Sequence, residues 1–116
     1  CKLHLPMRTW INGRWFGEAE AGVDMQFSFA DLIAHVAKSR PLTAGTLVGS
    51  GTIANEDTSK GASCLAEQRT VETLRDGKPA TPFLKFGDRV KIDITDQAGR
   101  SVFGAIEQVV KQYVPA

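Results

Sequence analysis

Cysteine, histidine and long apolar runs are scarce in this sequence, and each scarcity argues against a class of protein. There are 2 cysteines and 2 histidines. Cys1 and Cys64 form neither a C-x-x-C pair nor a spaced metal-binding pattern, and Cys64 is most simply a small buried hydrophobe. This usage favours a reducing, cytoplasmic compartment. No apolar stretch approaches the ~20 residues of a membrane span, and no signal peptide is evident.

An excess of either charge is also missing. The chain has 14 basic and 13 acidic side chains, a formal net charge of +1, and no basic run longer than two residues. This balance gives no reason to expect nucleic acid or a membrane surface as a partner. With 116 residues, of which 42% are hydrophobic, we expect one folded domain with a modest core. Because the chain starts at Cys1 without a methionine, we expect a segment of a longer protein or a processed product.

A β-hairpin is the strongest local signal in what the sequence does contain. Asn12-Gly13 separates the apolar stretch Leu3–Ile11 from Arg14–Phe16, and such a pair accepts the positive φ angles of a tight hairpin turn. Pro6 suggests that the first strand is interrupted or lies at a sheet edge, because proline lacks a backbone donor. The small and polar residues Gly17–Gly22 predict a loop.

One helix is predicted from a capping box. Ser28 suits the N-cap, and Asp31 stands in the position from which an acidic side chain can bond back to it. Pro41 ends the helix. The apolar residues between them follow helical spacing: Phe29, Leu32, Ile33, Val36 and Ala37.

The remaining segments read mainly as strands. We predict a short buried strand in Leu42–Val48, a strand in Ser63–Leu74, a hairpin turn at Asp76-Gly77, a half-buried strand around Val90, Ile92 and Ile94, a turn at Gln97–Gly99 and a returning strand in Ser101–Val110. One helix among about seven strands makes the fold class mainly β (α+β), with a mostly antiparallel or mixed sheet rolled on itself.

The stretch Val48–Glu67 carries the candidate chemistry. Gly49, Gly51 and Gly61 make a loop whose backbone N–H groups can approach an anionic ligand closely. The same stretch holds the hydroxyl of Thr52 and the carboxylate of Glu67. Glycine-rich turns are common in β-rich domains, so the loop alone does not assign a function.

Five motifs in order resemble the C-terminal half of the fumarylacetoacetate hydrolase family. They are W-I-N-G-R at 10–14, D-M-Q-F at 24–27, D-L-I-A-H at 31–35, G-S-G-T at 49–52 and P-F-L-K-F-G-D-R-V at 82–90. The S-G-T-I loop followed by G-x-S-x-x-x-E is most similar to bacterial fumarylacetoacetase, since acylpyruvate hydrolases and diene-dioate isomerases usually carry G-T-P. Ile53 stands here in place of that proline.

The resemblance implies a mixed β-sandwich roll, usually as a homodimer, that hydrolyses a carbon–carbon bond in a small diketo acid with the help of Mg²⁺ or Ca²⁺. For fumarylacetoacetate, the products are fumarate and acetoacetate, the last step of tyrosine breakdown. It implies that Gly51 and Thr52 bind a substrate carboxylate. Glu67 corresponds to the catalytic glutamate that pairs with a histidine to activate water, and Glu72 is the fallback because the spacing to Glu67 is slightly long.

The resemblance also implies that the metal ligands and the catalytic histidine belong to polypeptide preceding this chain. Residues 1–116 are then the C-terminal part of a catalytic domain, inactive alone. Glu18-Ala19-Glu20 repeats the family's Glu-x-Glu letters, but two loop acids do not make a magnesium or calcium site. Two alternatives stay open: acylpyruvate hydrolysis, decarboxylation or isomerisation within the same family, and a non-catalytic β-rich module that pairs with a separate upstream chain.

Overall fold

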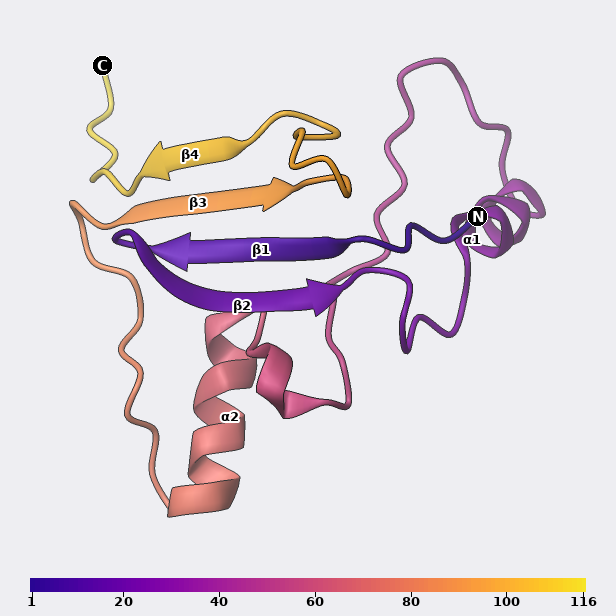
Figure 1. The fold of residues 1–116 in the computed structure, drawn as a ribbon. Coiled ribbons are helices and arrows are strands. Elements are labelled where there is room, and N and C mark those ends of the chain that lie inside the picture. The colour runs from indigo at the N-terminus through magenta and orange to yellow at the C-terminus, as the bar shows by residue number, and fades with distance from the viewer.

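The computed structural model describes residues 1–116 and contains one four-stranded sheet with two helices (Figure 1). The strands are β1 (Pro6–Ile11), β2 (Arg14–Glu20), β3 (Arg89–Ile94) and β4 (Ile106–Val109). The helices are α1 (Phe29–Ala37) and α2 (Leu65–Asp76), with a short 3₁₀ turn, η1 (Thr58–Lys60). Every strand pair is antiparallel, in the order β2-β1-β3-β4. The mainly β, α+β class is confirmed.

The hairpin and the first helix form where local signals predict them. Asn12 and Gly13 take φ angles of 51° and 76°, as a tight turn between β1 and β2 requires. At α1, the Ser28 hydroxyl accepts from the Asp31 N–H while the Asp31 carboxylate accepts from the Ser28 N–H, so both halves of the capping box are present. The predicted β3 and its return through β4 are also confirmed.

Of the two alternatives for the first strand, the edge position is wrong, whereas the stretch Leu3–Ile11 is interrupted as expected, because β1 begins only at Pro6. β1 is a central strand with β2 on one side and β3 on the other. Pro6 is tolerated because it is the first residue of β1 and pairs only with Glu20, whereas pairing with β3 begins at Met7. The expected loop at Gly17–Gly22 is mostly strand, since β2 continues to Glu20.

Three further predictions, all for residues 42–77, are wrong, and four strands replace the expected seven or so. Leu42–Val48 forms no strand. The predicted strand in Ser63–Leu74 is α2, whose straight-chain residues favour a helix and whose first turn carries the acid Glu67. Asp76-Gly77 is therefore not a hairpin turn: Gly77, with φ 82°, caps α2 in the left-handed conformation.

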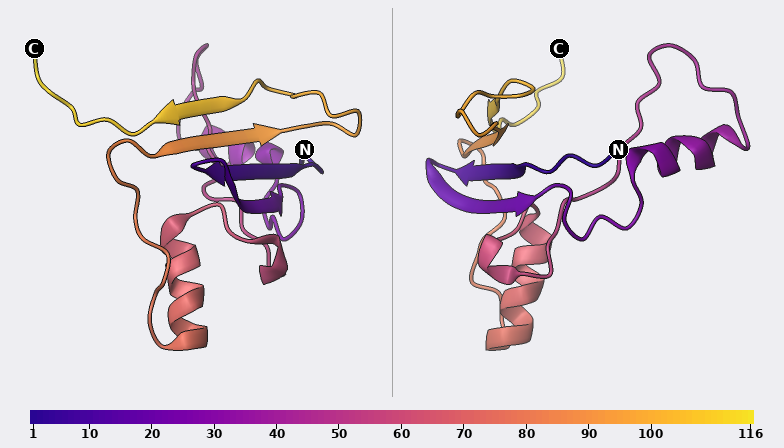
Figure 2. Two further views of the ribbon diagram at one scale, coloured as in Figure 1. Left: turned by 60° about the vertical axis from the view of Figure 1, so that its left-hand side comes forward. Right: turned by 45° about the vertical axis from the view of Figure 1, so that its right-hand side comes forward.

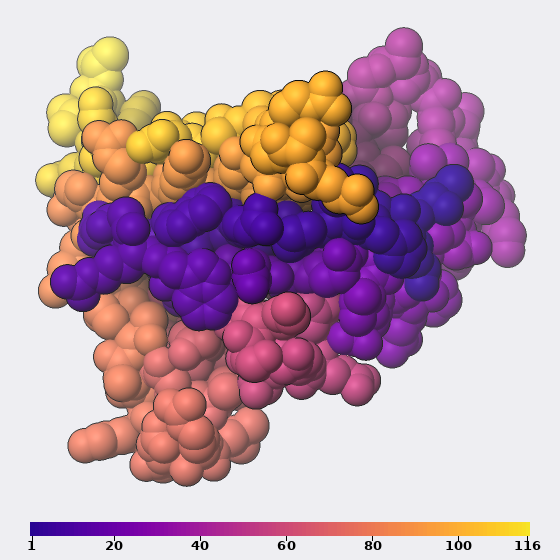
Figure 3. Space-filling view, viewed as in Figure 1, coloured from indigo at the N-terminus to yellow at the C-terminus, as the bar shows by residue number.

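The elements bury little surface among themselves. Four of the six buried residues lie where the β1–β2 pair meets the segment after η1: Thr9, Gly17, Ala19 and Ala62. The radius of gyration is 16.6 Å, whereas about 13 Å is typical of a compact chain of this length. α2 projects from the sheet in both views of Figure 2, and the space-filling view shows it and the loop after α1 as separate protrusions (Figure 3). Neither helix combines the length and apolar character that crossing a membrane requires.

Candidate functional site

A hollow lies between the N-terminal residues, the β2–α1 connection and the glycine loop. Its volume is about 790 Å³, and 12 of its 17 lining residues are hydrophobic. The segment 23–29 contributes Phe27 and Phe29, and the sheet end contributes Ile94. Lys2 also lines it, with its ammonium donating to the Met25 carbonyl. The hollow can therefore accept an apolar group with a polar or anionic end.

The glycine loop supplies two of the polar side chains of this hollow, those of Ser50 and Thr52, and Lys2, Asp24 and Gln26 supply the others. Ser50, Thr52 and Ile53 all line it. Gly51 has φ 88° and nothing near the position of a side chain, so the loop needs glycine there for its backbone conformation. Between Leu47 and Ile53 no backbone–backbone hydrogen bond forms, and the Thr52 hydroxyl has no partner in the chain. Its amides and hydroxyl are free to bind a ligand.

Glu67 lies in the first turn of α2 and does not line this hollow. It is half-buried and makes no hydrogen bond or ion pair within the chain. The only other carboxylate without such a contact is that of Glu56, which is exposed. Four residues before Glu67, the Ser63 hydroxyl is buried with no hydrogen-bond partner. The structure therefore does not bring Thr52 and Glu67 together in one hollow of this chain, and it leaves Glu67 available to an outside partner.

Glu72, the alternative glutamate, is fully engaged in holding the segment after α2. Its side chain accepts from the Thr81 hydroxyl at 2.5 Å, the Thr81 N–H at 2.8 Å, the Ala80 N–H at 2.7 Å and the Gln68 amide at 3.0 Å. The residue is only 5% exposed. The side-chain hydrogen bond from Thr81, followed by the backbone one and that from Gln68, lowers the pKa of Glu72 from 4.5 to about 2.

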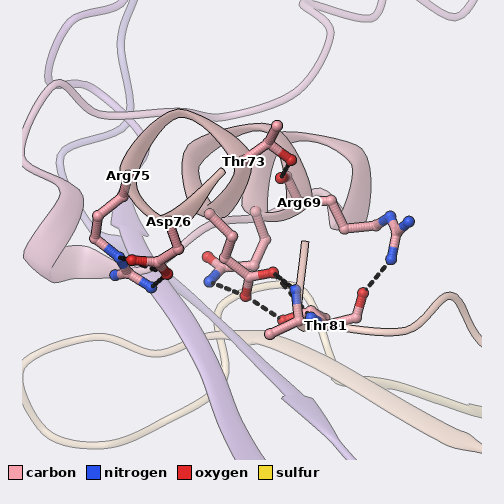
Figure 4. Close-up of polar contacts among 8 residues, drawn as sticks. Arg69, Thr73, Arg75, Asp76 and Thr81 are labelled. Atoms are coloured by element: carbon pink, nitrogen blue, oxygen red, sulfur yellow. Dashed lines mark hydrogen bonds and ion pairs between the residues drawn. The ribbon is translucent and has the colours of Figure 1, made fainter. Parts of the chain in front are cut away.

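Arg69 strengthens the same attachment. Its guanidinium donates to the Thr81 carbonyl and lies 4.4 Å from the centre of the Phe83 ring. Figure 4 shows Thr81 reaching toward α2 with Arg69 above it. Each oxygen of Glu72 already accepts two hydrogen bonds, so the structure gives Glu72 a structural role and leaves no free lone pair for orienting a catalytic base.

Glu72→Gln is expected to lower the thermal midpoint by roughly 5–10 °C at pH 7, because the new NH₂ group faces backbone donors. The folded pKa of about 2 lies below the ordinary 4.5, so this carboxylate stabilises the fold above pH 4.5 and the contribution is lost as pH falls toward 2. Thermal melts between pH 4.5 and pH 2 should show the thermal midpoint falling more steeply with decreasing pH in the parent than in the variant. The control Glu107→Gln, on the exposed β4, should keep the parental slope; equal slopes in Glu72→Gln would contradict the assignment.

The other acids named from the sequence, and one of the two histidines, have partners on the sheet or beside it. Glu18 lies 3.6 Å from Arg8, and Glu20 lies 3.9 Å from His4. Both glutamates belong to β2, not to the polar loop expected there. His35 is exposed on α1. No three His, Cys, Asp or Glu side chains come together in a group that could hold a metal ion.

The comparisons with known proteins identify one family. Residues 2–111 match the family model described as fumarylacetoacetate (FAA) hydrolase C-terminal. The comparison with curated proteins gives no match.

Proposed function

Since the chain belongs to the fumarylacetoacetate hydrolase family, we propose that it forms one wall of the active site of a hydrolase that cleaves a carbon–carbon bond in a β-diketo acid. The substrate closest to the sequence pattern is fumarylacetoacetate, which gives fumarate and acetoacetate in aromatic amino acid breakdown. The observation that carries the proposal is the Thr52 loop, whose unbonded hydroxyl and amides line the large hollow. The S-G-T-I sequence of that loop supports a relationship to the bacterial fumarylacetoacetases.

We assign Gly51 and Thr52 to a substrate carboxylate. The Thr52 hydroxyl can donate to a carboxylate oxygen, and neighbouring backbone N–H groups can donate alongside it. Lys2 supplies a positive charge at the same hollow, and Asp24, which also lines it, supplies a negative charge whose carboxylate accepts from the Glu56 N–H. The apolar residues around the loop then contact the carbon chain of the substrate.

Glu67 is assigned to the proton transfer step, as the carboxylate that orients a histidine base. That histidine removes a proton from the attacking water, and the electron pair of the cleaved bond passes to the acetoacetate carbon, which takes up a proton. The half-buried, unpaired state of Glu67 supports this role over Glu72, whose oxygens are occupied. We infer that the histidine comes from other polypeptide, because neither His4 nor His35 makes a hydrogen bond or an ion pair with Glu67.

The divalent metal that the family commonly uses, Mg²⁺ or Ca²⁺, does not fit the residues of this chain. A site for either ion needs several converging oxygens, and no group of three candidate ligands exists here. This chain alone therefore does not hold the metal. In the proposal its ligands come from the upstream polypeptide or from a second subunit, and we call this chain together with that polypeptide the assembled protein.

A second reaction is favoured by one observation. Because 12 of the 17 lining residues are hydrophobic, the hollow also suits an acylpyruvate with an apolar acyl group.

The test of the proposed function is turnover of fumarylacetoacetate and of acylpyruvates by the assembled protein and by this chain alone, with Mg²⁺ or Ca²⁺ added. We expect hydrolysis only by the assembled protein. Turnover by the isolated chain without metal would overturn the proposal, and inactivity of the assembled protein on every diketo acid would favour a non-catalytic module.

Thr52→Val should raise KM for the diketo acid about tenfold in the assembled protein, because it removes one hydrogen bond to a charged group. The reacting bond lies away from this carboxylate, so kcat should change little. Steady-state kinetics measures both quantities. An unchanged KM would remove Thr52 from the binding site.

A further inference from the structure

We infer that Asn55 is a positioning residue that fixes the Thr52 loop against the end of β2, an inference that rests on the proposed carboxylate-binding role of that loop. Asn55 lies three residues after Thr52 and is half-buried. Among residues 47–57, only Asn55 makes hydrogen bonds to a strand of the sheet.

The Asn55 side chain bonds to both backbone groups of Glu20, the last residue of β2. Its Oδ1 accepts from the Glu20 N–H at 2.7 Å, and its Nδ2 donates to the Glu20 carbonyl at 3.1 Å. The same Nδ2 lies 3.2 Å from the Val23 carbonyl. The amide thus pairs with the end of β2 as a neighbouring strand would, using one acceptor and two donors.

A second contact beside Asn55 supports the attachment. The Glu56 N–H donates to the Asp24 carboxylate at 2.9 Å. Asp24 has φ 60°, a conformation that residues other than glycine adopt infrequently. Further along, Gly61 pairs with Gly17 of β2 in an antiparallel bridge. The chain from Asn55 to Gly61 is therefore fixed along the edge of β2 at both ends.

The segment before Asn55 has no comparable attachment. From Leu47 to Ile53 there is no backbone–backbone hydrogen bond. Three extended residues span at most about 10 Å, so Asn55 limits how far Thr52 can move from the hollow. Holding the loop in place before a ligand arrives reduces the entropy lost on binding. This effect should appear in substrate affinity more than in the chemical step.

The test uses Asn55→Asp in the assembled protein, because aspartate keeps the acceptor for the Glu20 N–H and loses the donors to the carbonyls. We expect KM for the diketo acid to rise roughly tenfold while kcat stays within about twofold. Loss of folded protein alone would lower the apparent kcat and leave KM unchanged. An unchanged KM in Asn55→Asp, alongside a raised KM in Thr52→Val, would overturn the positioning role and leave the proposed function standing.

Asn12→Asp is the matched control. Asn12 also accepts from a backbone N–H, that of Arg89 at 2.9 Å, and donates its amide, to Asp88 at 2.9 Å, but it lies at the hairpin end of β1 and does not line the hollow. Aspartate tolerates its φ of 51°. We expect Asn12→Asp to leave KM and kcat at parental values. A KM increase equal to that of Asn55→Asp would overturn the inference.

A double variant shows whether Asn55 acts through Thr52. If it does, adding Asn55→Asp to Thr52→Val should raise KM much less than it does in the parent, because the contact it positions is already gone. Full additivity would overturn the inference. If Asn55→Asp does not fold, we test Asn55→Ser, which keeps one hydroxyl at this position. Asn55→Ser should also raise KM severalfold, and a parental KM in this variant would overturn the inference. Failure of Thr52→Val to change KM would remove the carboxylate-binding role of Thr52 and this inference together, while the proposed hydrolase activity would still be decided by turnover.

Discussion

Glu67→Gln is expected to reduce kcat of the assembled protein by about 10²–10⁴-fold while leaving the thermal midpoint close to that of the parent. Glutamine keeps the size of the side chain but cannot carry the negative charge that orients a histidine and stabilises its protonated form. The small effect on stability follows from the absence of any hydrogen bond or ion pair from Glu67 within the chain. Turnover and thermal melts on the same preparation measure both quantities.

The chain offers a matched control for this variant. Glu56 is the other carboxylate without an internal partner, but it is exposed and its N–H, not its side chain, makes the local contact. Glu56→Gln should leave kcat at the parental value. If Glu67→Gln retained full kcat, Glu67 would be a solvated helix residue and the catalytic assignment would be wrong. If it instead unfolded the protein, Glu67 would have a structural role that the present contacts do not contain.

Gly17→Ala is expected to destabilise the fold by about 3 kcal/mol, a large part of the stability of a typical domain. A methyl group on Gly17 would lie 2.2 Å from the Ala62 carbonyl oxygen and 2.8 Å from the Ala62 nitrogen. Both are backbone atoms, so no side chain can move aside to relieve the clash. The same place is the buried centre of the structure, where Ala19 is 0% and Ala62 is 3% exposed.

Urea denaturation of the assembled protein measures the loss, and Gly49→Ala is the control. An added methyl group at Gly49 meets no atom within 4 Å, and the residue does not have a positive φ. Its stability should stay within about 0.5 kcal/mol of the parent. A Gly17→Ala variant as stable as Gly49→Ala would show that β2 and the segment after η1 do not pack this closely in solution.

Local signals predicted the parts of the fold that short-range chemistry controls. The Asn12-Gly13 turn, the Ser28 capping box and the strand around Val90, Ile92 and Ile94 each depend on a few adjacent residues, and each is present. The family match was also within reach of the sequence, because it depends on the order of short motifs. For the same reason the sequence could name Thr52 and Glu67 as candidates.

α2 was misread because its buried face is not apolar. The one fully buried residue of the helix is Glu72, which is stable there only because residues from a later segment supply its hydrogen bonds. A pattern of apolar residues at helical spacing does not reveal a helix whose buried residue is a glutamate. The role of Asn55 was missed in the same way, since its partners are backbone groups of Glu20 and Val23. No property of an isolated asparagine in a polar stretch indicates them.

The sequence by itself determined the hairpin, the capped helix and the loop chemistry of Gly51 and Thr52, because turn angles, capping and glycine flexibility act over a few neighbouring residues. Only the tertiary structure decided that the Glu72 carboxylate is fully hydrogen-bonded and that the Glu67 carboxylate has no partner in the chain. It also decided that β1 lies inside the sheet. Those outcomes depend on contacts between segments far apart in the chain. They are set by which donors reach a buried carboxylate and which strand edges are paired.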